Sequence, residues 1–337
     1  MSSNSGVIVA MDWGGSWART SVVNRVGEVL WTMRVPTPQG TGSDNMLRVG
    51  EEVLLEAISW CRSTPILGVG IAVAGPIDVE SGTFYTPPNL LELDGISLID
   101  AWQDRLGHQI YIGNDATLAA LAEYYLGAGL HQRKAGRDAK TLLYLTISTG
   151  VGGGVIDRGN VLLGAHGMAA EIGHIKIDTS SSTALCNCGG TGCLESLVSG
   201  TAIARKAVHA LKNRYESRIL SDVDITKLSS QDVFTAYNAG DSLSEMIINE
   251  VISDLAHGIS DLIHSFNPDL VVLGGGVTVG LSSTKLLGNL KSQISDSLMS
   301  ERHKDFEIMY AQLGDSSGMV GASLMVQSSL KTSDSIV

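Results

Sequence analysis

Three cysteines and a nearby histidine form the most specific chemical pattern in the sequence. Cys186, Cys188 and Cys193 fall within eight positions, on a loop that also carries three glycines. Three thiolates need a fourth ligand to complete a tetrahedral Zn²⁺ site, and histidine is a common fourth. His174 and His166 both precede the loop, and we favour His174. A closed set of four protein ligands predicts a structural zinc, with a redox pair or simple reduced cysteines as the alternatives.

A first glycine-rich segment follows an apolar strand and has the composition of an anion site. It contains Asp12, Gly14, Gly15, Ser16 and Arg19. Two glycines let the backbone approach an anion, and successive N–H groups form an anion-binding nest. A carboxylate at the strand end is suited to holding Mg²⁺ through water beside phosphates. The alternative is a tight hairpin whose glycines only serve positive φ angles.

A second glycine-rich segment has the same logic, with hydroxyl groups as additional donors. It runs through residues 148–154 and includes Ser148, Thr149, Gly150 and Gly152. Its glycines lie in a predicted hairpin, whereas a dinucleotide fingerprint needs a strand, glycines and then a long helix. The sequence therefore favours phosphate binding over NAD binding.

Carboxylates supply the remaining candidates for chemistry. Asn114 and Asp115 follow a predicted strand and open a predicted helix. The pair is either a helix N-cap or an amide beside a general base, and position alone does not decide. Glu171 and Glu195 bracket the cysteine loop. Each is either a solvated surface charge or a ligand-binding carboxylate held by the loop.

The elements that carry these residues repeat one plan. Residues 7–31 and 142–163 each read as a buried strand, a glycine-rich hairpin and a return strand. Helices are predicted at 44–60 and 242–266, and strands at 68–73 and 270–273. Strands that alternate with helices predict an α/β protein. The repeat predicts two related halves whose glycine loops face one cleft.

Composition excludes several classes of protein. The chain has 337 residues, enough for about two domains, and 44% of them are hydrophobic, as expected for a globular protein. The formal charge of −12 disfavours nucleic-acid binding. No apolar run reaches the ~20 residues of a membrane helix, and no secretion signal precedes Val7. We therefore expect a cytoplasmic protein that binds neither nucleic acid nor membrane.

Together these motifs resemble the ROK family of sugar kinases and sugar-responsive repressors, within the actin-like ATPase superfamily. The resemblance runs from Asp12 to about Gly321. The sequence departs from the family pattern at Ser16, where threonine is commoner, and at Thr117, where asparagine is usual. The cysteine motif is highly specific, and the glycine loops are much less so.

The resemblance implies two ribonuclease-H-like α/β domains flanking a central cleft. It assigns residues 1–115 and about 316–330 to a small domain and 116–315 to a large one. It also implies Mg·ATP as a substrate complex and a structural zinc. The implied sugar-binding residues are Gly75, Asn89, Asn114, Asp115, Glu171, His174 and Glu195. The implied ATP-binding residues are Asp12, Gly14, Gly15, Ser16, Arg19, Ser148, Thr149, Gly150, Gly152, Gly274, Gly275 and Gly276.

The function expected from the resemblance is ATP-dependent phosphorylation of the 6-hydroxyl of a hexose, with glucose as the first choice and Asp115 as the catalytic base. N-acetylmannosamine or N-acetylglucosamine kinase is the alternative. A non-catalytic sugar-sensing regulator is the remote one, because only six residues precede Val7 and leave no room for a DNA-binding module. A homodimer or homotetramer is expected.

Overall fold

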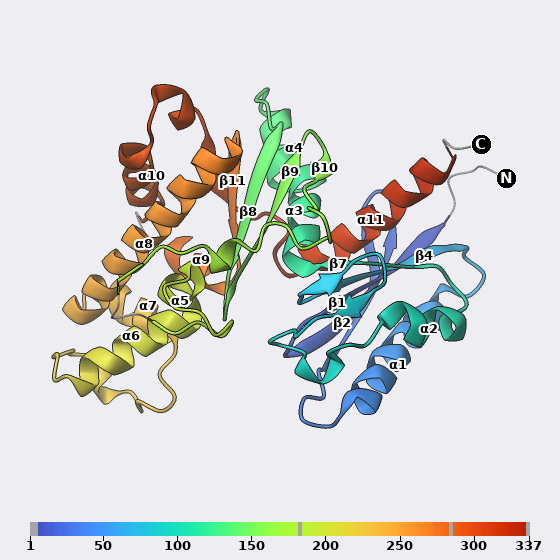
Figure 1. Ribbon diagram of the computed structural model, residues 1–337, viewed down its shortest axis with the longest axis horizontal. Coiled ribbons are helices and arrows are strands. Elements are labelled where there is room, and N and C mark those ends of the chain that lie inside the picture. The colour runs from blue at the N-terminus through green and yellow to red at the C-terminus, as the bar shows by residue number, and fades with distance from the viewer. Residues whose placement is uncertain (1–5, 181–183, 283–285, 335–337) are drawn as a thin grey trace. The chain divides into compact units, whose positions relative to one another are not determined.

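The computed structural model describes residues 6–180, 184–282 and 286–334 and divides into two units (Figure 1). Unit 1 comprises Met1–Ala135, Gly154–Ala170 and Gln312–Val337. Unit 2 comprises Gly136–Gly153 and Glu171–Ala311. Unit 1 contains one five-stranded sheet, and a second five-stranded sheet lies mostly in unit 2.

The sheet of unit 1 has the strand order β3-β2-β1-β4-β7. β1 and β2 form an antiparallel hairpin, and β3 pairs antiparallel with β2. On the other side, β4 pairs parallel with β1, and β7 pairs parallel with β4. A two-stranded hairpin of β5 and β6 lies outside it. The strands are β1 (Val7–Trp13), β2 (Trp17–Asn24), β3 (Val29–Pro36), β4 (Ile66–Val73), β5 (Ile77–Asp78), β6 (Thr83–Phe84) and β7 (Ile110–Asn114).

Helices cover both faces of this sheet. α1 packs on β2 and β3, and α11 packs on β1, β4 and α3 (Figure 1). α11 comes very close to β4, because a Cβ at Gly70 would lie 2.5 Å from the carbonyl oxygen of Ala322. The helices are α1 (Ser43–Cys61), α2 (Leu98–Leu106), α3 (Asp115–Tyr125), α4 (Ala128–Lys134) and α11 (Ser317–Asp334).

The core of unit 1 fixes the strand that carries the first candidate carboxylate. Trp13 and Trp102 are fully buried and stack with ring centroids 5.4 Å apart. A Cβ at Gly50 of α1 would lie 2.8 Å from the Trp102 ring, so glycine allows the helix to approach. Side chains alternate along a strand. Met11 and Trp13 therefore enter this core, and Asp12 faces α11 on the other side.

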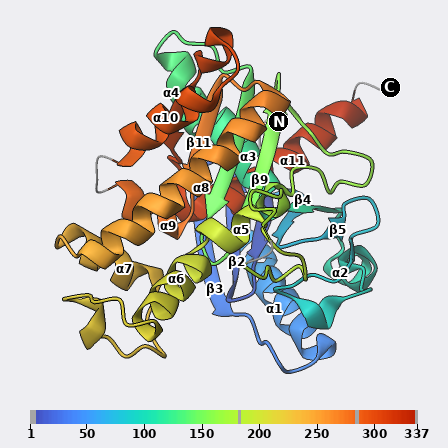
Figure 2. The same ribbon diagram turned by 60° about the vertical axis from the view of Figure 1, so that its left-hand side comes forward.

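The second sheet has the order β10-β9-β8-β11-β12, and the helices of unit 2 gather around α8 (Figure 2). The strands are β8 (Thr141–Ile147), β9 (Val151–Asp157), β10 (Asn160–Val161), β11 (Leu270–Gly274) and β12 (Glu307–Tyr310). The helices are α5 (Leu194–Val198), α6 (Gly200–Lys212), α7 (Ser230–Asn238), α8 (Ser242–Phe266), α9 (Gly276–Ser282) and α10 (Leu286–Ser297).

The two sheets share one plan, as the sequence predicts. In each, the first strand of the chain is central, with the next two strands on one side and the last two on the other. The expected α/β architecture is therefore confirmed. Grouping by contacts places residues 116–135, 154–170 and 312–315 in unit 1, although the domain division expected from the sequence assigns all of them to the second domain. The physical reason is that α3 packs on α11.

None of the helices in the described part of the chain is long and apolar enough to cross a membrane.

Candidate active site and metal centre

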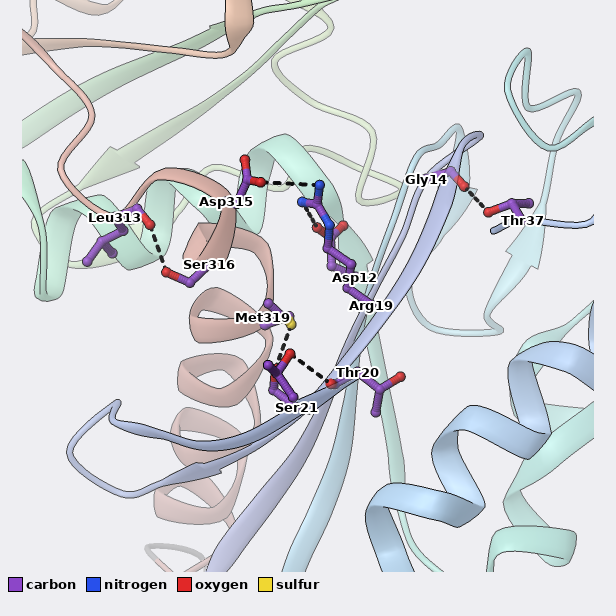
Figure 3. Close-up of polar contacts among 11 residues, drawn as sticks. Asp12, Gly14, Arg19, Thr20, Ser21, Thr37, Leu313, Asp315, Ser316 and Met319 are labelled. Atoms are coloured by element: carbon purple, nitrogen blue, oxygen red, sulfur yellow. Dashed lines mark hydrogen bonds and ion pairs between the residues drawn. The ribbon is translucent and has the colours of Figure 1, made fainter. Parts of the chain in front are cut away.

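The first glycine loop joins β1 to β2 and is held in place by neighbouring side chains. Neither Gly14 nor Gly15 has a positive φ angle, so turn geometry does not explain them. A Cβ at Gly15 would lie 3.1 Å from the backbone of Asn89, whereas a Cβ at Gly14 would meet little. Thr37 donates its hydroxyl hydrogen to the carbonyl oxygen of Gly14 (Figure 3). The backbone at Gly14 therefore has open space beside it and is held in position by the bond from Thr37.

Gln39 is a positioning residue that the sequence patterns do not reveal. Its amide nitrogen donates to the carbonyl oxygen of Gly15 at 2.6 Å and to that of Asn89 at 2.9 Å. One side chain therefore joins the predicted phosphate loop to the predicted sugar-binding residue Asn89. No local motif surrounds Gln39, and only the three-dimensional contact identifies it.

Asp12 lies opposite Arg19 in the β1–β2 register and against the first turn of α11 (Figure 3). Arg19 lies 3.8 Å from the Asp12 carboxylate and 3.4 Å from that of Asp315. Burial raises the pKa of Asp12 to about 6, the charge of Arg19 opposes the rise, and Asp315 adds to it. A partly buried carboxylate at a strand end fits the oxygen chemistry that Mg²⁺ prefers. The expected phosphate ligand Arg19 is paired with these two carboxylates.

We expect Asp12→Asn to make the protein more stable at neutral pH. A folded-state pKa of about 6, above the ordinary 3.8, means that folding favours the protonated carboxyl group. Its stabilising contribution is present below the ordinary pKa and is lost as the pH rises through 6. The variant should therefore gain roughly 2 kcal/mol in free energy of unfolding at pH 8 and little near pH 4, allowing for partial exposure of the side chain.

Urea unfolding of the wild type and the variant at several pH values measures this gain. Asp315→Asn is the matched control, because the Asp315 side chain is 90% exposed and should change stability little. A gain for Asp12→Asn that did not vary with pH would contradict burial as its cause.

The structure shows which of Asn114 and Asp115 caps α3, a question that their positions in the sequence leave open. Asn114 ends β7 and caps α3, because its side-chain oxygen accepts the N–H of Thr117 at 3.0 Å. Asp115 is the first residue of α3, and its carboxylate accepts the N–H of Ala116 at 2.7 Å. The amide of Asn114 also lies over Gly75, where a Cβ would come within 3.2 Å of the amide nitrogen. Asp115 is thus not the helix cap.

The second glycine loop and the predicted adenosine loop line one cavity within unit 2. The cavity has a volume of about 400 Å³ and includes Ser148, Thr149 and Gly276. The loop is braced, because Gly200 donates its N–H to Ser148 and the hydroxyl of Thr201 donates to Thr149. Gly275 adopts a φ of +89° beside the backbone of Ile147. The sequence analysis missed the other lining residues, which are Gly200, Thr201, Ala204, Ser229, Ser230 and Val277.

The four predicted metal ligands lie together in unit 2. The ligand atoms of His174, Cys186, Cys188 and Cys193 all fall within 4.8 Å of one another. Cys188 Sγ lies 3.7 Å from Cys193 Sγ, and Cys186 Sγ lies 3.6 Å from His174 Nδ1. Zn–S bonds of about 2.3 Å in a tetrahedron require S···S separations of about 3.8 Å. The set therefore fits a tetrahedral zinc ion, with His174 rather than His166 as the fourth ligand.

Glu195 connects the cysteine loop with the second glycine loop. One of its oxygens accepts the Cys186 thiol at 3.3 Å, and the other accepts the N–H of Val151 at 3.0 Å. A Cβ at Gly150 would lie 2.5 Å from the second oxygen, so a larger residue at this position would displace the Glu195 carboxylate. Glu195 thus contacts both the cysteine loop and the glycine loop that is predicted to bind phosphate.

Glu171 completes the polar group around His174. Partial desolvation raises the pKa of Glu171, the charge of His174 opposes the rise, and Glu195 adds to it. His174 presents Nδ1 to the cysteines, and its other ring nitrogen remains for a different partner. Glu171, His174 and Glu195 therefore interact electrostatically, as a shared binding site would require.

The predicted residues divide between the units. Gly152 belongs to unit 2 within β9, and Gly274 ends β11 beside Tyr144. Unit 1 holds Asp12, Gly14, Gly15, Ser16, Arg19, Gly75, Asn89, Asn114 and Asp115; unit 2 holds the second glycine loop, the metal ligands, Glu171, Glu195 and the glycines 274–276.

The chain is similar to known proteins over nearly its whole length. The model of the ROK family matches residues 8–329, so the chain belongs to the ROK family. A glucokinase from Thermotoga maritima is 30% identical over 95% of this chain and 97% of its own length. A xylose repressor from Caldicellulosiruptor bescii is 28% identical over 96% of this chain and 79% of its own length.

A solved structure extends the comparison to three dimensions. The crystal structure of a ROK family glucokinase from Streptomyces griseus in complex with glucose and AMPPNP is 27% identical, with a TM-score of 0.76. The match covers 96% of this chain and 100% of that chain. The expected fold of two actin-like ATPase domains is thereby confirmed.

Proposed function

We propose that this protein is an ATP-dependent hexose kinase that transfers the γ-phosphoryl group to the 6-hydroxyl of glucose. The observation that carries the proposal is the division of roles at the start of α3. Asn114 caps the helix, and Asp115, the first residue of α3, follows the carboxyl end of β7 in the sheet of unit 1. Glucokinases that match nearly the whole chain support the same activity.

Asp115 is the proposed general base. Its carboxylate accepts the proton of the 6-hydroxyl as that oxygen attacks the γ-phosphorus, and ADP leaves with the bond between the β- and γ-phosphates broken. The N-terminus of α3 favours the ionised carboxylate that this step requires. Glu171, His174 and Glu195 would hold the remaining sugar hydroxyls, together with Asn89 and Asn114.

The two glycine loops are the proposed phosphate contacts. Turn bonds occupy the N–H groups of Gly14 and Ser148, so we assign the phosphates to the N–H groups that follow them in each loop. Mg²⁺ bound with ATP would neutralise phosphate charge, and Asp12 is the residue placed to hold it through water. Positioning and electrostatics supply most of the rate enhancement in such transfers.

The cavity within unit 2 is the proposed nucleotide site. It combines the second glycine loop with Gly276 and with the N-terminus of α6 at Gly200 and Thr201. The N–H groups of Gly200 and Ala202 are already bonded to Ser148 and Ser199, so the support from this helix is the partial positive charge at its N-terminus, which favours an anion. This support for ATP binding is independent of the sugar-binding residues.

A structural zinc is the second part of the proposal. The proximity of three cysteine sulfurs and a His174 ring nitrogen, all within 4.8 Å of one another, supports a tetrahedral site, and four protein ligands would leave no position for water. Zinc would fix the loop that carries Cys193 and, two residues later, Glu195. Its role would be to order the sugar-binding carboxylate.

Turnover of several sugars tests the substrate assignment. ADP release with ATP·Mg²⁺ should give a higher kcat/KM for glucose than for mannose, fructose, N-acetylglucosamine or N-acetylmannosamine, because the kinases similar to this chain include glucokinases. If an N-acetyl sugar is preferred by tenfold or more, about 1.4 kcal/mol of discrimination, the alternative substrate is correct.

A sugar-sensing regulator is the second candidate, because the xylose repressor also matches almost the whole chain. A regulator would bind sugar without consuming ATP. Absence of sugar-dependent ADP release from a zinc-loaded protein that binds glucose would favour it over the kinase.

A further inference from the structure

Lys176 contacts the cluster of His174, Cys186, Cys188 and Cys193, although it is not part of the cysteine motif. Its ammonium nitrogen is 2.9 Å from Cys193 Sγ and 2.9 Å from the carbonyl oxygen of Thr191. Because Cys193 Sγ is one of the four candidate ligand atoms, the Lys176 cation can directly affect how this cluster binds a metal ion.

The backbone places Lys176 opposite Cys193. The two residues form an antiparallel bridge. Backbone bonds on both sides of the bridge fix it, from Leu194 N–H to Ile175 oxygen at 3.0 Å and from Ile177 N–H to Gly192 oxygen at 2.9 Å. The side chain of Lys176 therefore starts from a defined position beside the ligand.

Gly190 provides the space for the ammonium group. A Cβ at this position would lie 2.7 Å from Lys176 Nζ and 3.5 Å from Cys188 Sγ. Any other residue would push the ammonium away from the cluster or displace the loop. The loop is thus shaped to receive both the metal ligands and the cation.

Charge explains what this cation would do. Three thiolates, a neutral imidazole and Zn²⁺ carry a net charge of about −1. Glu195 adds a carboxylate at 3.3 Å from Cys186 Sγ, and Glu171 interacts electrostatically with Glu195 and His174. An ammonium group bonded to one thiolate offsets this excess negative charge. Groups that bond metal ligands from outside typically change metal affinity by about 10- to 100-fold.

We propose that Lys176 is the outer-sphere cation of the zinc centre: its ammonium group donates to the Cys193 thiolate, compensates the negative charge of the site and slows zinc release. The inference deepens the proposed zinc site and rests on it. Lys176 is a positioning residue for the metal and has no contact with the substrate in this account.

Zinc release to an excess of a chromogenic chelator measures the effect on the intact protein. Lys176→Met should release zinc about tenfold faster than the wild type, and Lys176→Arg, which keeps the charge, more slowly than Lys176→Met. Lys212→Met is the matched control, because it removes an exposed cation from α6 of the same unit and should leave the rate unchanged.

The salt dependence of zinc release distinguishes two roles of Lys176. One is compensation of negative charge, and the other is holding the loop through its hydrogen bond to Thr191. Raising the ionic strength from 0.1 to 1 M shortens the screening length from about 10 to about 3 Å, so the ratio of the two release rates should shrink. Equal release rates for Lys176→Met and the wild type, or a ratio insensitive to salt, would overturn the proposal. Elemental analysis that found no zinc in the folded wild type would overturn the metal site itself, and the role of Lys176 with it.

Discussion

Asp115→Asn should fold, bind zinc and bind glucose, and yet turn over at least about a hundredfold more slowly than the wild type. An amide has the shape of the carboxylate but cannot accept the 6-hydroxyl proton, and loss of a general base typically costs about 10² to 10⁴ in rate. The fold should survive because Asn114, not Asp115, caps α3. Loss of a charge at the first helical position costs only about 0.3–1 kcal/mol.

The measurement pairs calorimetric binding of glucose with steady-state turnover on one preparation. The Kd for glucose should change by about tenfold at most, whereas kcat should fall. Asp104→Asn is the matched control, because it makes the same chemical change at an exposed position of α2 in unit 1 and should leave both quantities unchanged. Near-normal turnover in Asp115→Asn would remove Asp115 from catalysis, and loss of binding with turnover would make it a sugar ligand.

Cys188→Ser should lose zinc and sugar affinity together. Serine does not replace a thiolate as a zinc ligand in a structural site of this kind, and the remaining three ligands leave the coordination incomplete. Without the metal, the loop no longer holds His174 and Glu195 in place, and Glu195 also loses its fixed position toward the N–H of Val151. We expect zinc content near zero, a Kd for glucose weakened at least about tenfold, and a larger fall in kcat/KM.

Zinc content by elemental analysis and glucose binding by calorimetry on the same samples check this result. Cys61→Ser is the control, because Cys61 is distant in sequence from the cysteine cluster. The Cys61 thiol is buried and donates to the carbonyl oxygen of Ala57, a bond that a serine hydroxyl also makes. A well-folded, fully active wild type without zinc would refute the structural role of the metal.

The features that local patterns encode were predictable from the sequence. The alternation of apolar strands, glycine hairpins and return strands predicted the antiparallel hairpin that opens each sheet, because strand pairing across a short turn depends on adjacent residues. The clustering of the four candidate metal ligands was predictable for a similar reason. Cys186, Cys188 and Cys193 share one loop, and only His174 had to be chosen from outside it.

Features that depend on contacts between distant segments were not predictable. Gln39 joins Gly15 to Asn89, from which it is separated by 24 and 50 positions in the sequence, and no motif surrounds it. The lining residues Ser229 and Ser230 of the unit 2 cavity come from the start of α7, where serine is equally expected as a helix cap. The pairing of Arg19 with Asp315 depends on where α11 packs. The oligomeric state stays a prediction.

Identification of the phosphorylated product tests the central claim most directly. Zinc-loaded wild-type protein is incubated with ATP·Mg²⁺ and glucose, and the products are followed by phosphorus NMR. The account predicts equal amounts of ADP and glucose 6-phosphate, with no ADP formed when glucose is omitted. Unchanged ATP, a phosphate on another hydroxyl, or ADP formed equally without glucose would contradict it.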